Sequence, residues 1–565
     1  MIEVRGVGQR VDGGRRTLRD VSLTIGSGEL VAIIGGSGAG KTTLLDAIAG
    51  IRPPAEGEVR YDGDGTGKGG GNGRGLGYVP QDDIVHLEMP LRRTLRYAAG
   101  LRLPAGTPAD RAGRAVDAVL EALALTGRAG QRVGSLSGGE RKRASIAVEL
   151  LTRPRVFFLD EPTSGLDPAT AADLMRLLRG LADSGTTVVL TTHHPPDAAA
   201  CDQVAVLALD GTLAFYGPPG AAREAFQADG IEDIYVRLAG AGEPHDWASR
   251  FGGAQDGGVR ESGVQESGGR ESGGGEGGSE AAGDAAGAPA GAFAQWALLT
   301  RRNLDLMTRN RLTLAVLGGS PLMVLAMFAV LFRPGAFSPE SPSPGATVMI
   351  LFWIAFGGFF FGLTYGLPQI CAELPVLRRE RLAGLRIGPY VLAKVAVLLP
   401  LLAVVDALML GVLRGLDRLP ALGWRTYGEL LATLLLCSLA ALALGLLVSA
   451  AVTDAVQATM ALPMLCFPQV LFVGAILPVP VMAAPGRWLS FAMSNRWAFE
   501  GLGHTLGVER LWASGRSPLG PPLLGSYGDT FSRAAAVDWA LLAGFTVIFL
   551  VVTGLILVRR TPNAP

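Results

Sequence analysis

A glycine-rich octapeptide near the beginning of the chain has the residue types and spacing of a phosphate-binding loop. It reads Gly35, Gly36, Ser37, Gly38, Ala39, Gly40, Lys41 and Thr42, and Thr43 follows it. Glycines in this pattern let backbone N–H groups converge on phosphate oxygens at a helix N-terminus, where the helix dipole adds positive potential. Lys41 would then reach the β- and γ-phosphates, and the Thr42 hydroxyl would bind Mg²⁺.

Two adjacent carboxylates, Asp160 and Glu161, follow an apolar run at residues 156–159. Asp160 is suited to hold Mg²⁺ through water, and Glu161 is suited to orient and deprotonate an attacking water molecule. Acidic strand ends are common, so this pair indicates nucleotide hydrolysis only together with the phosphate-binding loop.

A third motif, Leu136-Ser137-Gly138-Gly139-Glu140, lies shortly before these carboxylates. It resembles the signature motif of ABC transporters. The resemblance implies that Ser137 and the backbone amides of Gly138 and Gly139 open a helix that binds the γ-phosphate of an ATP held by a partner subunit. Two such heads would therefore sandwich two ATP molecules.

Other members of the same family set are present by resemblance. Gln81 resembles the glutamine that senses Mg²⁺ and the membrane domain, Asp167 lies in a segment similar to the D-loop, and His193 resembles the switch histidine that contacts the γ-phosphate. His194 is expected to be structural. ABC heads often stack an upstream aromatic residue on adenine, and residues 9–12 contain none, which leaves open how adenine is held.

These motifs need a scaffold of buried strands, and the sequence predicts one. From residue 1 to about residue 240, short β-rich runs alternate with Ala/Leu-rich helical stretches, as in an α/β domain. Residues 30–34, 156–159 and 187–191 have the composition of buried parallel strands, and each run ends just before a candidate site residue. Asp210-Gly211, between two later apolar runs, predicts a tight hairpin.

The bulk composition places this domain in a larger membrane protein. The chain has 565 residues, more than one hydrophobic core usually organises. Lys plus Arg and Asp plus Glu both number 50, so the balanced charge gives no reason to expect nucleic acid as a partner. Four scattered cysteines indicate neither a disulfide framework nor a metal site. The first residues lack the features of a signal peptide, so we expect this domain in the cytoplasm.

We therefore divide the chain into an ATP-binding domain at residues 1–240, a linker at 241–290 and a membrane domain at 291–565. The linker is rich in Gly, Ser and Glu, and Glu-Ser-Gly recurs at residues 261–263, 266–268 and 271–273. Such a composition cannot bury enough apolar surface to fold, which favours a passive, disordered tether over a phosphorylated regulatory segment.

The third part contains six apolar segments of the length that a bilayer requires, about 20 residues each. They cover residues 312–332, 347–367, 390–413, 430–452, 456–476 and 539–558. An even number returns both ends of this domain to one side. Most flanking arginines favour cytoplasmic termini, whereas Arg414, Arg418 and Arg425 oppose that orientation.

A head that precedes six spans in one chain resembles the G-type, or White-like, ABC transporters. Residues 373–381, which follow the second predicted span, resemble the cytoplasmic coupling elbow of that family's type-2 membrane domain, and residues 495–500 resemble its outer segment, where partly re-entrant helices are expected. The resemblance covers nearly the whole chain outside the linker.

Together these features predict an α/β P-loop NTPase head of the ABC ATPase class and an all-α membrane domain of six helices. We expect a half-transporter in the cell membrane that binds ATP and Mg²⁺, pairs with a second copy of itself or a similar half-transporter, and exports a hydrophobic or amphipathic substrate. The alternative is an ATP-driven regulatory or mechanical device that translocates nothing. The sequence does not specify the substrate.

Overall fold

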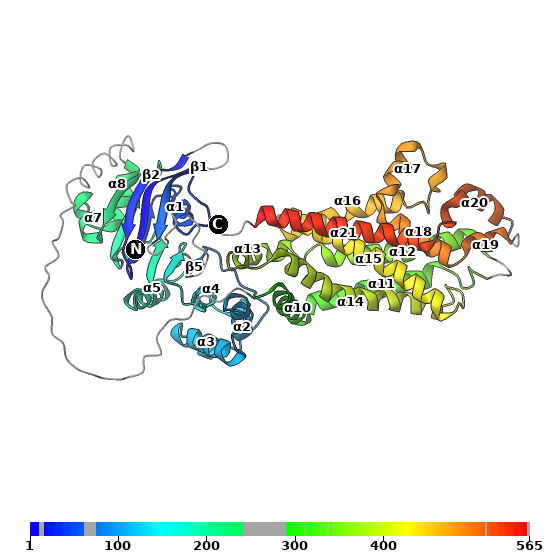
Figure 1. Ribbon diagram of the computed structural model, residues 1–565, viewed down its shortest axis with the longest axis horizontal. Helices are drawn as coiled ribbons and strands as arrows, with labels where there is room; N and C mark the ends of the chain where they lie inside the picture. Colours follow the sequence, from blue (N-terminus) through cyan, green and yellow to red (C-terminus); the bar gives the residue numbers. More distant parts are fainter. Residues whose placement is uncertain are drawn as a thin grey trace. The chain divides into compact units, whose positions relative to one another are not determined.

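The computed structural model describes residues 1–10, 16–61, 75–240, 290–309, 311–338, 340, 342–514 and 517–561. Within them the chain forms two compact units, with the main division between Ala290 and Gly291 (Figure 1). The expected linker at residues 241–290 lies outside the described residues, apart from Ala290.

The first unit contains two sheets. Six strands form one sheet in the order β5 (Leu76–Val79), β6 (Val156–Leu159), β7 (Thr187–Thr191), β3 (Leu30–Gly35), β8 (Gln203–Leu207) and β9 (Leu213–Gly217). Its strands pair in parallel from β5 to β8, and β9 is antiparallel to β8, which confirms the predicted hairpin. A second, antiparallel sheet has the order β2 (Arg16–Ile25), β1 (Ile2–Arg10) and β4 (Glu56–Tyr61).

Eight α-helices are described in this unit: α1 (Lys41–Ile48), α2 (Leu91–Arg102), α3 (Ala109–Ala122), α4 (Gly138–Leu150), α5 (Pro168–Asp183), α6 (Pro195–Ala199), α7 (Pro219–Ala225) and α8 (Ile231–Gly240). Helices α2 to α8 bury one face of the parallel sheet, and α1 together with the antiparallel sheet buries the other. In β3, Leu30, Ala32 and Ile34 enter one hydrophobic cluster, and the alternate residues Val31 and Ile33 enter the other. Burial on both faces explains why this strand is an unbroken apolar run.

The order of the parallel strands positions the candidate site. The neighbours β6, β7 and β3 all run in the same direction, so their carboxyl ends meet at one edge of the sheet. The phosphate-binding loop follows β3, the two carboxylates follow β6, and His193 comes shortly after β7. Ligands of open α/β sheets bind at such an edge.

The second unit is helical among its described residues. Its helices are α10 (Ala292–Arg309), α11 (Arg311–Leu331), α12 (Pro344–Gly366), α13 (Leu374–Leu382), α14 (Ile387–Gly415), α15 (Trp424–Ala451), α16 (Ala455–Leu471), α17 (Ala484–Phe491), α18 (Ser494–Thr505), α19 (Val508–Ala513), α20 (Gly520–Tyr527) and α21 (Ala535–Arg560). All six predicted spans coincide with helices: α11, α12, α14, α15, α16 and α21.

Length and composition support four of these six as spans. The helical segments Pro344–Leu382, Ile387–Gly415, Trp424–Ala451 and Ala535–Arg560 are long and apolar enough to cross a membrane. The predicted first and fifth spans correspond to shorter apolar stretches, Pro321–Leu331 and Ala455–Leu471. The total of six therefore stays a prediction. Helix α10 has no counterpart among the sequence predictions, which began this unit's helices at residue 312.

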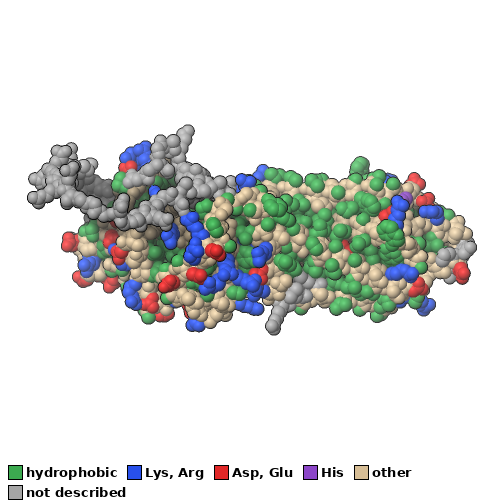
Figure 2. Space-filling model, turned by 60° about the horizontal axis from the view of Figure 1, so that its bottom comes forward, with side chains coloured by type: hydrophobic (Ala, Val, Ile, Leu, Met, Phe, Trp, Pro, Cys, Tyr) green, Lys and Arg blue, Asp and Glu red, His purple; other side chains and the backbone are tan. Residues whose placement is uncertain are grey.

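The surface and the interior of this unit both suit a bilayer. Hydrophobic side chains cover much of the face seen in Figure 2, and one stripe of α21 exposes Val547, Val551, Leu555 and Val558. Inside, glycines of α12 lie directly against α15, because a Cβ added at Gly362 would lie 2.1 Å from the carbonyl oxygen of Ser438. Small residues at helix contacts are typical of membrane bundles, where close packing rather than hydrophobic burial holds helices together.

Candidate active site

The phosphate-binding loop joins β3 to α1 through residues whose conformation requires glycine. Gly38 and Gly40 have φ of 82° and 95°, in the left-handed region that L-residues with a Cβ seldom occupy. A Cβ at Gly40 would also lie 2.6 Å from the carbonyl oxygen of Thr17, whereas a Cβ at Gly38 would meet open space. The loop therefore keeps its backbone accessible at Gly38 and close-packed at Gly40.

Lys41 lies at the start of α1 with its amine folded back over the loop. Its Nζ donates hydrogen bonds to the carbonyl oxygens of Gly35 at 3.0 Å and Gly36 at 3.1 Å. Burial lowers the pKa of this amine, and the nearby carboxylates of Glu161 and Asp160 oppose that change. The loop thus holds a buried cation beside two acids.

Asp160 lies at the centre of the oxygen-rich side of the candidate site. Its Oδ1 accepts hydrogen bonds from the hydroxyls of Thr42 at 3.0 Å and Thr191 at 2.6 Å. Hydroxyl and carboxylate oxygens are the ligands that Mg²⁺ prefers, directly or through water. The paired oxygens of Thr42 and Asp160 therefore fit the ion that the sequence predicts, and together with the loop they fit a magnesium nucleotide.

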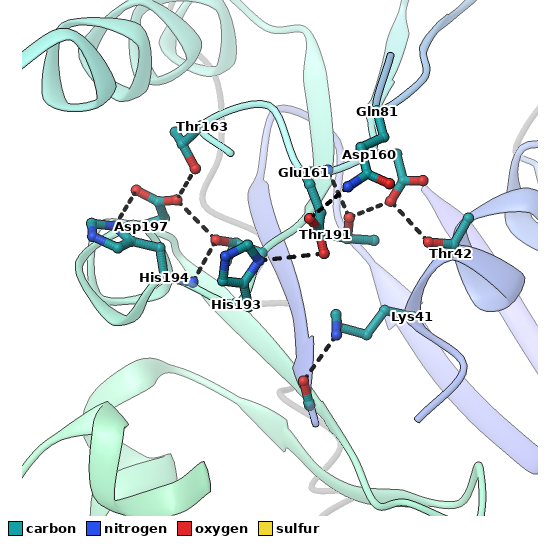
Figure 3. Close-up of polar contacts among 12 residues, drawn as sticks. Lys41, Thr42, Gln81, Asp160, Glu161, Thr163, Thr191, His193, His194 and Asp197 are labelled. Carbon is teal, nitrogen blue, oxygen red and sulfur yellow. Dashed lines mark hydrogen bonds and ion pairs between the residues drawn. The ribbon is translucent and has the colours of Figure 1, made fainter. Parts of the chain in front are cut away.

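Glu161 lies between two other predicted site residues (Figure 3). Its Oε2 accepts a hydrogen bond from Nε2 of Gln81 at 3.1 Å, and its Oε1 is 3.3 Å from Nδ1 of His193. The Glu161 backbone has a φ of 45°, and its N–H donates to the Thr191 hydroxyl at 2.9 Å. The structure therefore brings together Thr42, Asp160, Glu161, Gln81 and His193.

The remaining predicted residues form a second group at the N-termini of α4 and α5. Ser137 caps α4 through a reciprocal pair of hydrogen bonds with Glu140, and these bonds lower the pKa of the Glu140 carboxyl. Asp167 caps α5 by accepting two hydrogen bonds from Thr170, which lower its pKa. A Cβ at Gly139 would lie 2.3 Å from Cγ2 of Thr170, so the two helix starts are packed together.

Two positioning groups were not predicted from the sequence. Thr191 joins Asp160 to the backbone of Glu161. Asp197, buried in α6, accepts hydrogen bonds from the hydroxyls of Thr163 and Thr192 and lies 3.3 Å from Nδ1 of His194. The structure thus gives His194 a partner, in keeping with its expected structural role. Thr191 stands in the segment around His193 that resembles the switch loop, but that resemblance assigned it no contact, and Asp197 was singled out by no motif.

Residues 9 and 10, which belong to the stretch without an aromatic residue, lie in β1. The Gln9 amide oxygen accepts a hydrogen bond from the backbone N–H of Ala55 at 2.8 Å, so this side chain is engaged with the residue that precedes β4. Residues 11 and 12 lie outside the described part of the chain.

Comparison with known proteins follows the same two-part division. Residues 18–164 match the ABC transporter family, and residues 294–506 match the ABC-2 type transporter family. The second match and the apolar helices identify a multi-pass membrane protein.

Individual relatives extend the comparison. An ABC transporter ATP-binding/permease protein of Mycobacterium tuberculosis is 32% identical over 561 residues, which cover 97% of this chain and 62% of that protein. ATP-binding cassette sub-family G member 5 of Mus musculus is 42% identical over 215 residues, which cover 36% of this chain and 32% of that protein. ABC transporter G family member 26 of Arabidopsis thaliana is 36% identical over 225 residues, covering 38% and 32%.

This chain therefore spans about three fifths of the length of the mycobacterial relative and about a third of the other two. The chain thus carries an ABC transporter ATP-binding domain followed by an ABC-2 type transporter membrane domain, and its relatives include members of the G family.

Proposed function

We propose that this chain is a half-transporter that hydrolyses ATP as a dimer and uses the energy to export a hydrophobic or amphipathic substrate through its membrane domain. The observation that carries the proposal is the position of Glu161, held by Gln81 and His193 beside the Thr42–Asp160 pair. The order of a head followed by a membrane domain, as in the G-type family, supports export across the cell membrane from a cytoplasmic head.

The phosphate-binding loop and the residues around Glu161 have distinct roles in this proposal. The loop amides and Lys41 would bind the β- and γ-phosphates, and Thr42, Asp160 and Gln81 would hold Mg²⁺, which would supply charge neutralisation at the phosphates. Glu161 accepts a proton from the attacking water, and Gln81 and His193 fix its two carboxylate oxygens. His193, whose ring is more than half exposed, is free to contact the γ-phosphate.

A second copy completes the site. Ser137, Gly138 and Gly139 open α4 in a group distinct from the cluster around Glu161, and Asp167 lies with them. We infer that these residues serve the ATP held by the partner's phosphate-binding loop. Both halves of a composite site occur in one chain, so a homodimer suffices, although pairing with a similar half-transporter satisfies the same chemistry.

Complementation between two inactive variants tests this arrangement. Lys41→Ala disables the phosphate-binding loop of its own chain, and Ser137→Arg blocks the signature end that serves the partner. Each variant alone forms dimers with two defective sites. A mixed dimer has one site with an intact loop and an intact signature, so co-expression should restore ATP hydrolysis that neither variant shows. If purified mixed dimers stay as inactive as the parents, the proposed composite site is wrong.

Transport is tested apart from hydrolysis. The purified protein in lipid vesicles is screened with lipids, drugs and polymers for substrates that stimulate its ATPase, and movement of each stimulating compound is followed. ATP-dependent movement is the expected result. Hydrolysis in vesicles without movement of any stimulating compound would favour the regulatory or mechanical device.

A further inference from the structure

A buried lysine in α4, the helix that begins at the signature motif and is called the signature helix below, makes contacts to which the proposed function assigns no role. Lys142 lies on the second turn of α4, and only 4% of its surface is exposed. Its Nζ donates a hydrogen bond to the carbonyl oxygen of Gln81 at 2.6 Å and lies 3.6 Å from Oδ1 of Asp83. The ammonium therefore ties α4 to the loop that carries Gln81.

The contact continues into the cluster around Glu161. The Gln81 side chain donates to Oε2 of Glu161 at 3.1 Å, while its main-chain carbonyl accepts from Lys142. One residue thus receives the lysine on its backbone and positions the glutamate with its side chain. A displacement of α4 would therefore pull on the backbone of Gln81 and change the orientation of the side chain that contacts Glu161.

Burial of an ammonium is unfavourable unless it is paired. Burial lowers the pKa of Lys142, and Asp83 opposes that change. Attachment of α4 to the rest of the domain is already provided by a buried, bidentate ion pair between Arg102 and Glu149, with contacts of 2.6 and 2.8 Å. The lysine is therefore not the sole polar anchor of this helix.

We propose that Lys142 is a positioning residue that couples the two ATP sites of the dimer. The inference rests on the proposed function: the N-terminus of α4 serves the ATP held by the partner, whereas Gln81 and Glu161 act on the ATP of their own chain. Lys142 is the link between these two ends within one copy. Occupancy of one site then sets the position of Gln81 and Glu161 in the other.

The test compares four variants of the full-length protein in lipid vesicles. Lys142→Met removes the donor, Lys142→Arg keeps a cation, and Asp83→Asn removes the facing charge. Arg102→Met is the matched control, since it removes a buried cation that contacts the other end of α4. The measurements are kcat, KM for ATP and the Mg²⁺ concentration for half-maximal hydrolysis. Two further readouts are independent of turnover: the Hill coefficient of ATP binding in the Glu161→Gln background, and hydrogen exchange of residues 80–84 without nucleotide.

Lys142→Met should lower kcat by about tenfold to a hundredfold with little change in KM, because a displaced catalytic group reacts slowly. It should also raise the Mg²⁺ requirement, speed hydrogen exchange at residues 80–84 and bring the Hill coefficient toward that of independent sites. Lys142→Arg should restore most of each value, and Asp83→Asn should shift them in the same direction by less. Arg102→Met should lower thermal stability and leave the Hill coefficient and the hydrogen exchange of residues 80–84 unchanged. Molecules that unfold bind no ATP, so they reduce the amount of binding without altering the Hill coefficient of the folded molecules.

A wild-type Hill coefficient and wild-type hydrogen exchange in Lys142→Met would overturn the inference, as would the same changes in Arg102→Met. Should Lys142→Met fail to fold, Asp83→Asn decides: a shift in both readouts supports the coupling, and unchanged readouts overturn it. If the wild-type protein hydrolyses no ATP, the proposed function fails, and the inference fails with it. If the wild type is active and only these readouts stay unchanged, the inference alone fails.

Discussion

At the scale of single residues, one hydroxyl holds the two acidic groups of the site in register. Thr191 ends β7, donates to Asp160 at 2.6 Å and accepts from the backbone N–H of Glu161 at 2.9 Å. Glu161 has a positive φ of 45°, a conformation that costs free energy for a residue with a Cβ. The threonine therefore stabilises a turn that aims the Glu161 carboxylate at Gln81 and His193.

Thr191→Val tests this role, because it keeps the shape and removes both hydrogen bonds. The variant should lose about 1–3 kcal/mol of free energy of unfolding, since it leaves the partly buried N–H of Glu161 without its acceptor. Its kcat should fall as well, because Glu161 is no longer held in place. Thermal unfolding and ATP hydrolysis of the purified protein measure both effects, and Thr191→Ser, which keeps the hydroxyl, is the control. Wild-type values in Thr191→Val would rule out the role.

The candidate site residues differ in how far the sequence could reveal them. Lys41, Asp160 and Ser137 stand in short contiguous motifs, where type and spacing carry the signal. Thr191 contacts Asp160 and Glu161 across 31 and 30 positions, and Lys142 contacts Gln81 across 61 positions. A threonine at a strand end and a lysine in a helix are ordinary, so their roles become visible only when the fold brings the partners together.

At the scale of elements, the starts of α4 and α5 are packed as one unit. Gly139 lies so close to α5 that an added Cβ would be 2.3 Å from Cγ2 of Thr170. The hydroxyl of the same threonine donates to Asp167, the cap of α5. The signature helix and the D-loop cap are therefore expected to move together.

Gly139→Ala should force these two helices apart and cost about 1–3 kcal/mol of stability, as overpacked sites do. Thr170→Ser removes the methyl group and keeps the hydroxyl, so the double variant Gly139→Ala with Thr170→Ser should recover most of the loss. Thermal unfolding of the wild type, the two single variants and the double variant gives the coupling free energy between the two positions. Additive effects, with no recovery in the double variant, would contradict the packing described here.

Close helix packing also holds α12 against α15 in the membrane domain. A Cβ at Gly362 would lie 2.1 Å from the carbonyl oxygen of Ser438, and one at Gly366 would lie 2.6 Å from that of Leu442. Gly362→Ala should therefore cost about 1–3 kcal/mol through overpacking. Gly411→Ala in α14 is the matched control, because its added Cβ would meet open space. Thermal unfolding in detergent compares the two, and equal effects would refute the close contact.

The sequence predicted the elements of the first unit better than those of the second. Strands β3, β6 and β7 lie where the apolar runs indicated, because burial on both faces leaves an unambiguous pattern. The sequence did not predict helix α10, because polar residues such as Arg301 and Arg302 make it less apolar than a membrane span. Helix α16 has the apolar composition of a membrane span, but it is shorter than the helices that are long enough to cross a membrane.

At the scale of the whole molecule, the division into a nucleotide-binding domain and a membrane domain follows from the sequence, and the family matches agree with it. Motif order is read along the chain, so it needs no knowledge of contacts. The identity of the partner and of the substrate depends on surfaces that meet only in an assembly. The partner and the substrate therefore remain part of the proposal, and the complementation and vesicle experiments test them.

The central claim is that Glu161, held by Gln81 and His193, drives ATP hydrolysis in this membrane protein. The most direct measurement is Mg²⁺-dependent ATP turnover by the purified full-length protein in lipid vesicles, wild type against Glu161→Gln, with ATP binding measured in parallel. Loss of a general base should lower turnover by about a hundredfold or more while ATP binding is retained. Turnover at the wild-type rate in Glu161→Gln would contradict the account.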